Sequence, residues 1–221
     1  MYKAIIFDFD GLIVDTESVW YDVTKEVMLD YGCDLKLENF AKYIGTTGGG
    51  LYDELNAMSD QPFDRELVKS RTNELYQQRK DQFALREGVL DYLQAAKEHG
   101  LKIGLASSSS RKWVVDYLDR FKILDYFQVI KTSDDVQKVK PDPELYVQAL
   151  QELEVEPNEA LCFEDSLNGL TAAVGAGLHC VIVPNPVTQY LDFKGHVHRL
   201  TSMSELSFDD LLDHLTKKQH K

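Results

Sequence analysis

The stretch Ala4-Ile5-Ile6-Phe7-Asp8-Phe9-Asp10-Gly11 decides the fold that we expect for this chain. An uninterrupted apolar run is typical of a strand that is buried on both faces of a parallel sheet. Two carboxylates and a glycine follow directly, at the strand end where open α/β sheets bind their ligands. Carboxylates two residues apart suit a hard cation, and one of them could attack a phosphorus atom. The candidate site therefore begins at Asp8 and Asp10.

Further apolar segments of the same kind follow along the chain. They cover residues 101–106, 127–130, 160–163 and 179–183. Helical periodicity fills most of the intervals between them, over residues 87–99, 143–153, 166–176 and 208–215. This alternation predicts an α/β fold with a doubly wound parallel sheet, as in Rossmann-like proteins.

One long interval breaks the alternation. Between Asp10 and Leu101 there is no strand pattern, although a crossover between parallel strands needs far fewer residues. The interval instead shows helical periodicity over residues 16–31, 51–58 and 64–82. We expect a helical cap of residues 16–82, inserted into an α/β core of residues 1–15 and 83–221. A long disordered loop is a poor alternative, because the segment is periodic and rich in aromatic residues.

The composition limits the partners of the chain. There are 24 Lys and Arg against 37 Asp and Glu, a net charge of −13, which argues against nucleic acid or an anionic membrane as a partner. No apolar run approaches the roughly 20 residues that span a bilayer. Three widely spaced cysteines fit reduced thiols. We expect a soluble, cytoplasmic monomer.

Polar residues follow the other predicted strands as well. Four serines occupy positions 107–110, Lys140-Pro141 comes after the strand at 127–130, and Glu164-Asp165-Ser166 comes after the strand at 160–163. Taken singly, the serines and Asp165 could be helix caps and Lys140-Pro141 could be an exposed turn. The carboxyl ends of parallel strands meet at one edge of a sheet, so we expect these groups to lie together.

The order of these motifs resembles that of the haloacid dehalogenase superfamily, and more closely its branch of β-phosphoglucomutases and small sugar-phosphate phosphatases. The shared order is Asp-x-Asp-Gly, a serine after a strand, Lys-Pro, and then Glu-Asp. The resemblance covers nearly the whole chain, including the position of the cap. It implies a Mg²⁺-dependent phosphatase that hydrolyses small phosphomonoesters, first of all sugar phosphates, through an aspartyl-phosphate intermediate.

The resemblance also implies a role for each strand end. Asp8 would be the nucleophile, and Asp10 the general acid and base. Ser107 would hold a phosphoryl oxygen, and Lys140 would neutralise the nucleophile and the phosphoryl group. A phosphate dianion approaches an ionised carboxylate only where positive charge lies between them, and Mg²⁺ and Lys140 would supply it. The implied Mg²⁺ ligands are Asp8, Asp10 through its backbone carbonyl, Glu164 and Asp165.

The sequence of the predicted cap indicates which class of substrate to expect. β-Phosphoglucomutases carry a histidine at the position of Trp20 and an arginine in the cap loop that matches residues 45–50, which contain no basic residue here. The loss of a cationic clamp for a second phosphate favours a phosphatase over a mutase. Trp20 is equally consistent with a pocket wall and with a plain helix-core residue. The expected substrate-binding residues are Thr16, Trp20, Gly45, Thr46, Thr47, Arg71, Ser108 and Ser109.

Three other functions are alternatives. A β-phosphoglucomutase-type mutase would convert sugar phosphates into one another. A metal-free haloacid dehalogenase would use Asp8 on carbon, but it would need neither an acid at Asp10 nor the pair Glu164-Asp165. A receiver-like signalling domain also phosphorylates a strand-end aspartate, but such domains are much shorter and carry no cap.

Overall fold

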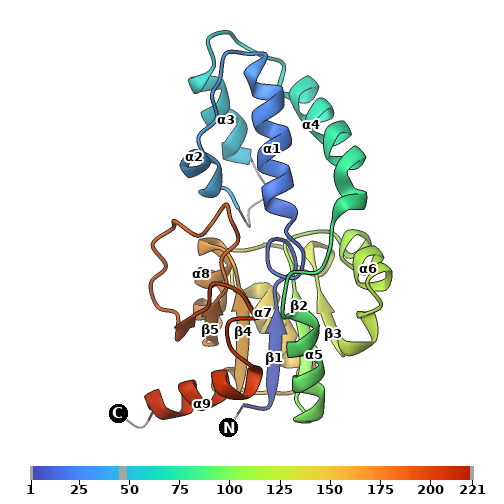
Figure 1. The fold of residues 1–221 in the computed structure, drawn as a ribbon, viewed down its shortest axis with the longest axis vertical. Helices are drawn as coiled ribbons and strands as arrows, with labels where there is room; N and C mark the ends of the chain where they lie inside the picture. The colour runs from blue at the N-terminus through green and yellow to red at the C-terminus, as the bar shows by residue number, and fades with distance from the viewer. Residues whose placement is uncertain (1, 45–48, 220–221) are drawn as a thin grey trace.

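The computed structural model describes residues 2–44 and 49–219, and within these residues six strands form one parallel sheet (Figure 1). Their order across the sheet is β3-β2-β1-β4-β5-β6, so that β1 lies in the middle between β2 and β4. The strands are β1 (Ala4–Phe7), β2 (Lys102–Ala106), β3 (Val129–Lys131), β4 (Ala160–Glu164), β5 (His179–Ile182) and β6 (His198–Arg199). The predicted doubly wound α/β fold is confirmed.

Helices cover both faces of the sheet, which explains why the strands are apolar without alternation. Ala4 and Ile6 of β1 belong to a core cluster with side chains of α7 and α8, whereas Ile5 and Phe7 belong to a cluster with side chains of α5, α6 and α9. These helices are α5 (Val89–Glu98), α6 (Arg111–Arg120), α7 (Glu144–Leu153), α8 (Leu167–Gly175) and α9 (Phe208–Gln219).

A group of helices lies above the carboxyl edge of the sheet, and all of it comes from the interval between β1 and α5 (Figure 1). Its elements are α1 (Thr16–Leu29), α2 (Leu37–Ala41), α3 (Gly49–Met58), α4 (Arg65–Arg79) and the 3₁₀ turn η1 (Lys80–Gln82). These helices pack around a further apolar cluster, which includes Val27, Phe40, Leu55 and Val68 and is joined by Val187 from the core. We propose residues 16–82 as the cap, the range expected from the sequence.

The chain enters and leaves this group of helices at neighbouring points. Val14, just before α1, forms an antiparallel bridge with Leu85, just after η1. The backbone N–H of Arg86 donates to the carbonyl of Ile13 over 2.9 Å, which extends this pairing. The two connections between the cap and the core are therefore held side by side.

Two differences from the sequence-based expectations concern short elements. The edge strand β6 and the helix α2 escaped prediction, because two to five residues are too short to show a period. The predicted strand at 127–130 begins two residues late, at Val129, because a 3₁₀ turn (Leu124–Tyr126) precedes it. Among the described residues, no helix is both long and apolar enough to cross a membrane.

Candidate active site

The end of β1 delivers Asp8 into the middle of the carboxyl edge. The backbone N–H of Asp8 donates to the carbonyl of Phe163 on β4 over 3.0 Å, which continues the ladder by one residue. The chain then turns sharply, with the Phe9 carbonyl accepting from three following N–H groups. Gly11 has φ +80°, and a Cβ there would overlap the Asp165 carboxylate. A glycine is therefore required at this position by backbone conformation and by space.

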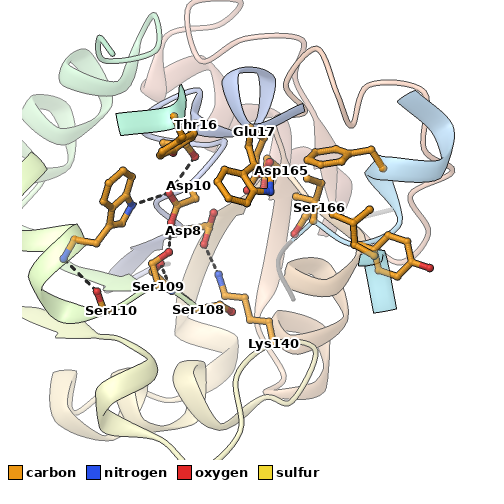
Figure 2. A pocket seen from close by; sticks show the side chains of 18 of the residues that line it. Asp8, Asp10, Thr16, Glu17, Ser108, Ser109, Ser110, Lys140, Asp165 and Ser166 are labelled. Atoms are coloured by element: carbon orange, nitrogen blue, oxygen red, sulfur yellow. Dashed lines mark hydrogen bonds and ion pairs between the residues drawn. The ribbon is translucent and has the colours of Figure 1, made fainter. Parts of the chain in front are cut away.

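A cavity of about 410 Å³ lies between the cap and this edge of the sheet (Figure 2). It brings together residues from four strand ends, as the sequence predicted, and residues from the cap helices α1 and α4. The predicted site residues that line it are Asp8, Asp10, Thr16, Trp20, Ser107, Ser108, Ser109, Lys140 and Asp165.

Three carboxylates and one ammonium group are buried at the floor of this cavity. Asp8, Glu164 and Asp165 each offer an oxygen within 4.8 Å of the others. Lys140, only 2% exposed, forms ion pairs with Asp8 and, over 2.7 Å, with Glu164. Burial disfavours its charge, but the pairing with Asp8 and Glu164 raises the pKa of Lys140, so the ammonium group stays protonated.

The carboxylates outnumber the positive charge that faces them. Burial and the neighbouring Glu164 raise the pKa of Asp8 to about 8, despite the opposing effect of Lys140. Burial and Asp8 also raise the pKa of Asp165 well above its usual range. A set of oxygen ligands with excess negative charge in a buried position fits a hard divalent cation.

Glu164 is saturated with hydrogen-bond donors. Its Oε1 accepts from Lys140 and, over 2.6 Å, from the Tyr146 hydroxyl. Its Oε2 accepts from the Asp165 backbone N–H over 3.2 Å and from the Ser166 hydroxyl over 3.4 Å. Four donors use the acceptor capacity of a carboxylate. The geometry therefore favours Asp8 and Asp165 over Glu164 as direct ligands of a cation, with Glu164 holding Lys140 in place.

Two glycines of α8 give a matched test of this anchoring. A Cβ at Gly169 would overlap the Glu164 carboxylate, whereas a Cβ at Gly175 in the same helix would meet only Pro143, at an ordinary 3.5 Å. We expect Gly169→Ala to lower the melting temperature and the activity, because Glu164 and then Lys140 must move. Gly175→Ala is expected to leave both unchanged or slightly improved, because alanine favours helix. Equal melting temperatures for the two variants would contradict this account.

The Asp10 carboxylate is held by three donors (Figure 2). The hydroxyl of Thr16 donates to Oδ1 over 3.0 Å, and the hydroxyl of Ser109 donates to Oδ2 over 2.6 Å. The indole N–H of Trp113 also donates to Oδ1, over 3.0 Å. Thr16 and Ser109, which we expected to bind substrate, therefore contact the candidate acid and base in this structure.

Ser107 lies at the end of β2, where it is 1% exposed and still lines the cavity. Its backbone N–H donates to the carbonyl of Lys131, so this group belongs to the sheet and does not face a ligand. Its hydroxyl oxygen accepts from the backbone N–H of Ser109 over 3.0 Å. The hydroxyl proton can therefore be directed to a phosphoryl oxygen in the cavity.

Other predicted cap residues divide into three cases. Trp20 lines the cavity and also packs edge-on against Tyr76, with ring centroids 5.0 Å apart, so both interpretations of this residue hold. Arg71 does not reach the cavity, because its guanidinium pairs with Asp30 over 2.7 Å on the cap surface. The prediction that Arg71 contacts the substrate therefore finds no support in this geometry. Gly45, Thr46 and Thr47 lie outside the described residues.

Sequence reasoning missed Asn185, Arg86 and Trp113, all of which support the site. The Asn185 amide donates to Asp165 Oδ2 over 2.6 Å. The Arg86 guanidinium donates to the carbonyls of Gly11, Val183 and Pro184 and so fastens the turn after β1 to the end of β5. Asn185 follows a strand, and the rule used for the other strand ends could have found it. Neither Arg86 nor Trp113 belongs to any pattern that singles it out.

Known hydrolases and phosphatases are similar to this chain in sequence. The sequence model of the haloacid dehalogenase-like hydrolases matches residues 5–183. The chain is 47% identical over 219 residues to "Putative phosphatase YhcW" of Bacillus subtilis (strain 168), covering 99% of this chain and 100% of that protein. It is 30% identical over 181 residues to "Phosphorylated carbohydrates phosphatase" of Thermotoga maritima, covering 80% and 82%.

A solved structure supports the fold. The structure of β-phosphoglucomutase from Clostridium difficile has a TM-score of 0.78 with this chain, at 24% identity and with 100% of both chains covered. The family match spans most of the chain and includes Asp8, Lys140 and Asp165. The chain therefore belongs to the haloacid dehalogenase-like hydrolases, within which it is a phosphoric monoester hydrolase.

Proposed function

We propose that this protein is a Mg²⁺-dependent phosphatase that hydrolyses sugar monophosphates through a phosphorylated Asp8. The observation that carries the proposal is the buried group of Asp8, Lys140 and Asp165 beneath a cavity whose outer wall is partly aromatic and, among the described residues, carries no cation. A relative at 30% identity is named for phosphorylated carbohydrates, which supports this substrate class.

Asp8 and Asp165, with the backbone carbonyl of Asp10, would hold the Mg²⁺ ion. When bound, the ion would neutralise these carboxylates and withdraw charge from a phosphoryl oxygen. Lys140 would keep its positive charge beside Asp8 and the transferred group. Ser107 would donate its hydroxyl proton to a second phosphoryl oxygen. In phosphoryl transfer this positioning and charge stabilisation supply most of the catalysis.

The proposed reaction has two phosphoryl-transfer steps. An Asp8 oxygen attacks phosphorus, the bond from phosphorus to the sugar oxygen breaks, and the sugar oxygen takes a proton from Asp10. Water then attacks phosphorus and returns a proton to Asp10, while the bond between phosphorus and Asp8 breaks. The cap wall formed by Trp20 and Tyr76 limits the access of bulk water to the intermediate.

The cavity wall favours removal of a phosphate over its rearrangement. Among the described residues that line it, Lys140 is the only cation, and Lys140 already faces Asp8. A mutase must also hold a second phosphate, for which the described residues of this wall offer no second positive charge. Amide and aromatic groups suit a neutral polyhydroxylated substrate. Besides Glu17, whose pKa is raised by burial and by Asp10, the outer wall contains Trp20, Tyr43, Asn73, Tyr76, Gln77 and Trp113.

The test is a phosphate-release screen with Mg²⁺ over sugar monophosphates, sugar bisphosphates and other small phosphomonoesters. We expect release from sugar monophosphates without net conversion between their isomers. Isomer conversion that outruns phosphate release would replace the proposal with a mutase. Halide release from a haloacid without Mg²⁺ would replace it with a dehalogenase.

Removal of the metal gives a separate prediction. Treatment with a chelator is expected to abolish turnover, and added Mg²⁺ should restore it. Asp165→Asn removes one proposed ligand and is expected to raise the Mg²⁺ concentration for half-maximal rate by about 10-fold or more. Asp116→Asn is the matched control, because Asp116 pairs with Lys112 on the exposed face of α6. An unchanged Mg²⁺ requirement in Asp165→Asn would remove Asp165 from the ligand set.

A further inference from the structure

The two oxygens of the Asp10 carboxylate have different partners. Oδ1 accepts from the Thr16 hydroxyl and from the Trp113 indole, each over 3.0 Å. Oδ2 accepts from the Ser109 hydroxyl over 2.6 Å. A hydroxyl can turn and accept a proton instead of donating one, but an indole N–H can only donate. A proton on the Thr16 side of Oδ1 would leave the Trp113 N–H bonded to the hydroxyl oxygen of a carboxyl group, which is a poor acceptor. A proton on Oδ2 instead leaves Oδ1 as a carbonyl oxygen, which accepts well from Trp113.

Trp113 cannot easily turn its N–H away from Asp10. Its ring packs at a centroid distance of 4.6 Å against Tyr117 of α6, 5.8 Å against Tyr76 of α4, and 6.5 Å against Phe83. These neighbours come from the core, the cap and the connection between them. Close packing on several sides fixes a ring more firmly than a single hydrogen bond does.

We propose that Trp113 is a positioning residue that keeps Asp10 Oδ1 as a hydrogen-bond acceptor and thereby assigns the catalytic proton to Oδ2. This inference rests on the acid and base role proposed for Asp10. In the first step Oδ2 gives its proton to the leaving sugar oxygen as the bond from phosphorus to that oxygen breaks. In the second step Oδ2 takes a proton from the attacking water, and the Ser109 hydroxyl turns to fit each state.

The dependence on the leaving group tests this role. An alkoxide leaving from a sugar phosphate needs a proton from Asp10, whereas the stable anion leaving from p-nitrophenyl phosphate does not. We expect Trp113→Phe to lower kcat/KM for sugar phosphates by roughly 10- to 100-fold and for p-nitrophenyl phosphate by less than about threefold. An equal loss on both substrates would reduce Trp113 to a packing residue and overturn the proposal.

Two further variants make the result decisive. Replacement of Trp113 by benzothienylalanine keeps the shape of the ring and exchanges the N–H for sulfur. This protein should show the same dependence on the leaving group as Trp113→Phe. It also provides the test if Trp113→Phe folds poorly. Tyr117→Phe alters the adjoining ring without touching Asp10 and is expected to leave both substrates unaffected. Full activity of the benzothienylalanine protein on sugar phosphates would refute a role for the N–H.

Asp10→Asn separates this inference from the proposed function. If Asp10→Asn also loses far more activity on sugar phosphates than on p-nitrophenyl phosphate, the acid role of Asp10 stands, and the Trp113 result then decides the inference alone. If Asp10→Asn lowers kcat/KM, which reports the first step alone, equally for both substrates, the acid role fails, and the inference fails with it.

Discussion

Asp8→Asn is expected to lower phosphate release from every phosphomonoester by about 10⁴-fold or more, because the proposed covalent intermediate forms on the Asp8 carboxylate. Asp8 is the carboxylate that Lys140 faces directly, and it lies at the end of the central strand beneath the cavity. The measurement is phosphate release with saturating Mg²⁺. Activity that survives in this variant would disprove the proposed mechanism.

The same variant is expected to fold at least as well as the wild type. The pKa of Asp8 rises from its ordinary value of 3.8 to about 8. A carboxyl with a raised folded-state pKa weakens the fold progressively as pH rises through this window, since the unfolded state ionises first. Asparagine removes that cost, while Lys140 keeps its pair with Glu164.

The pH dependence of the melting temperature checks this point. With a chelator present, the advantage of Asp8→Asn over the wild type should be larger at about pH 9 than at about pH 5. A melting temperature below that of the wild type at both pH values would contradict it. An inactive and well-folded Asp8→Asn protein would show that the loss of activity is chemical.

Lys140→Met is expected to destabilise the protein by about 3–5 kcal/mol at neutral pH, because it strands buried carboxylates without their cation. Lys140 faces Asp8 and Glu164, which are 6% and 0% exposed. Loss of that cation removes an interaction that lowers the pKa of Asp8, so the penalty should shrink as pH falls and Asp8 protonates. Activity should fall as well, because the phosphoryl group loses its neutralising partner.

A double variant separates charge from packing. Lys140→Met combined with Glu164→Gln removes one buried charge of each sign, so it should recover part of the stability that Lys140→Met loses. Added Mg²⁺ should raise the melting temperature of Lys140→Met more than that of the wild type, because the cation replaces missing charge. The measurement is urea or thermal unfolding of the wild type, Lys140→Met, Glu164→Gln and the double variant. Strict additivity of the two substitutions would show that the two charges do not interact.

The central features of the fold were predictable because they are local patterns. An apolar run that ends in Asp8 or Glu164 identifies both a strand and its carboxyl end, and the parallel sheet then gathers those ends at one edge. The cap could be predicted for a related reason, since the interval after Asp10 is too long for a crossover. Composition and periodicity alone were sufficient for these conclusions.

The remaining parts of the site depend on which side of each helix faces the cavity. No local sequence pattern determines this. Trp113 reaches Asp10 because α6 packs with that side next to the cap, and Arg86 reaches three carbonyls across two strand ends. Arg71 does not line the cavity for the same reason, because its side of α4 faces Asp30. Side chains on helices are thus the part of the site that tertiary packing decides.

The paired connections at Val14 and Leu85 have an evolutionary consequence. The chain leaves the core and returns to it at neighbouring points. The distance between these two points therefore does not depend on the length of the cap. A different helical insertion could be attached at this junction while the sheet, Asp8 and Lys140 stay as they are. Such a junction allows the residues at the sheet edge to stay the same while the wall of the cavity above them changes.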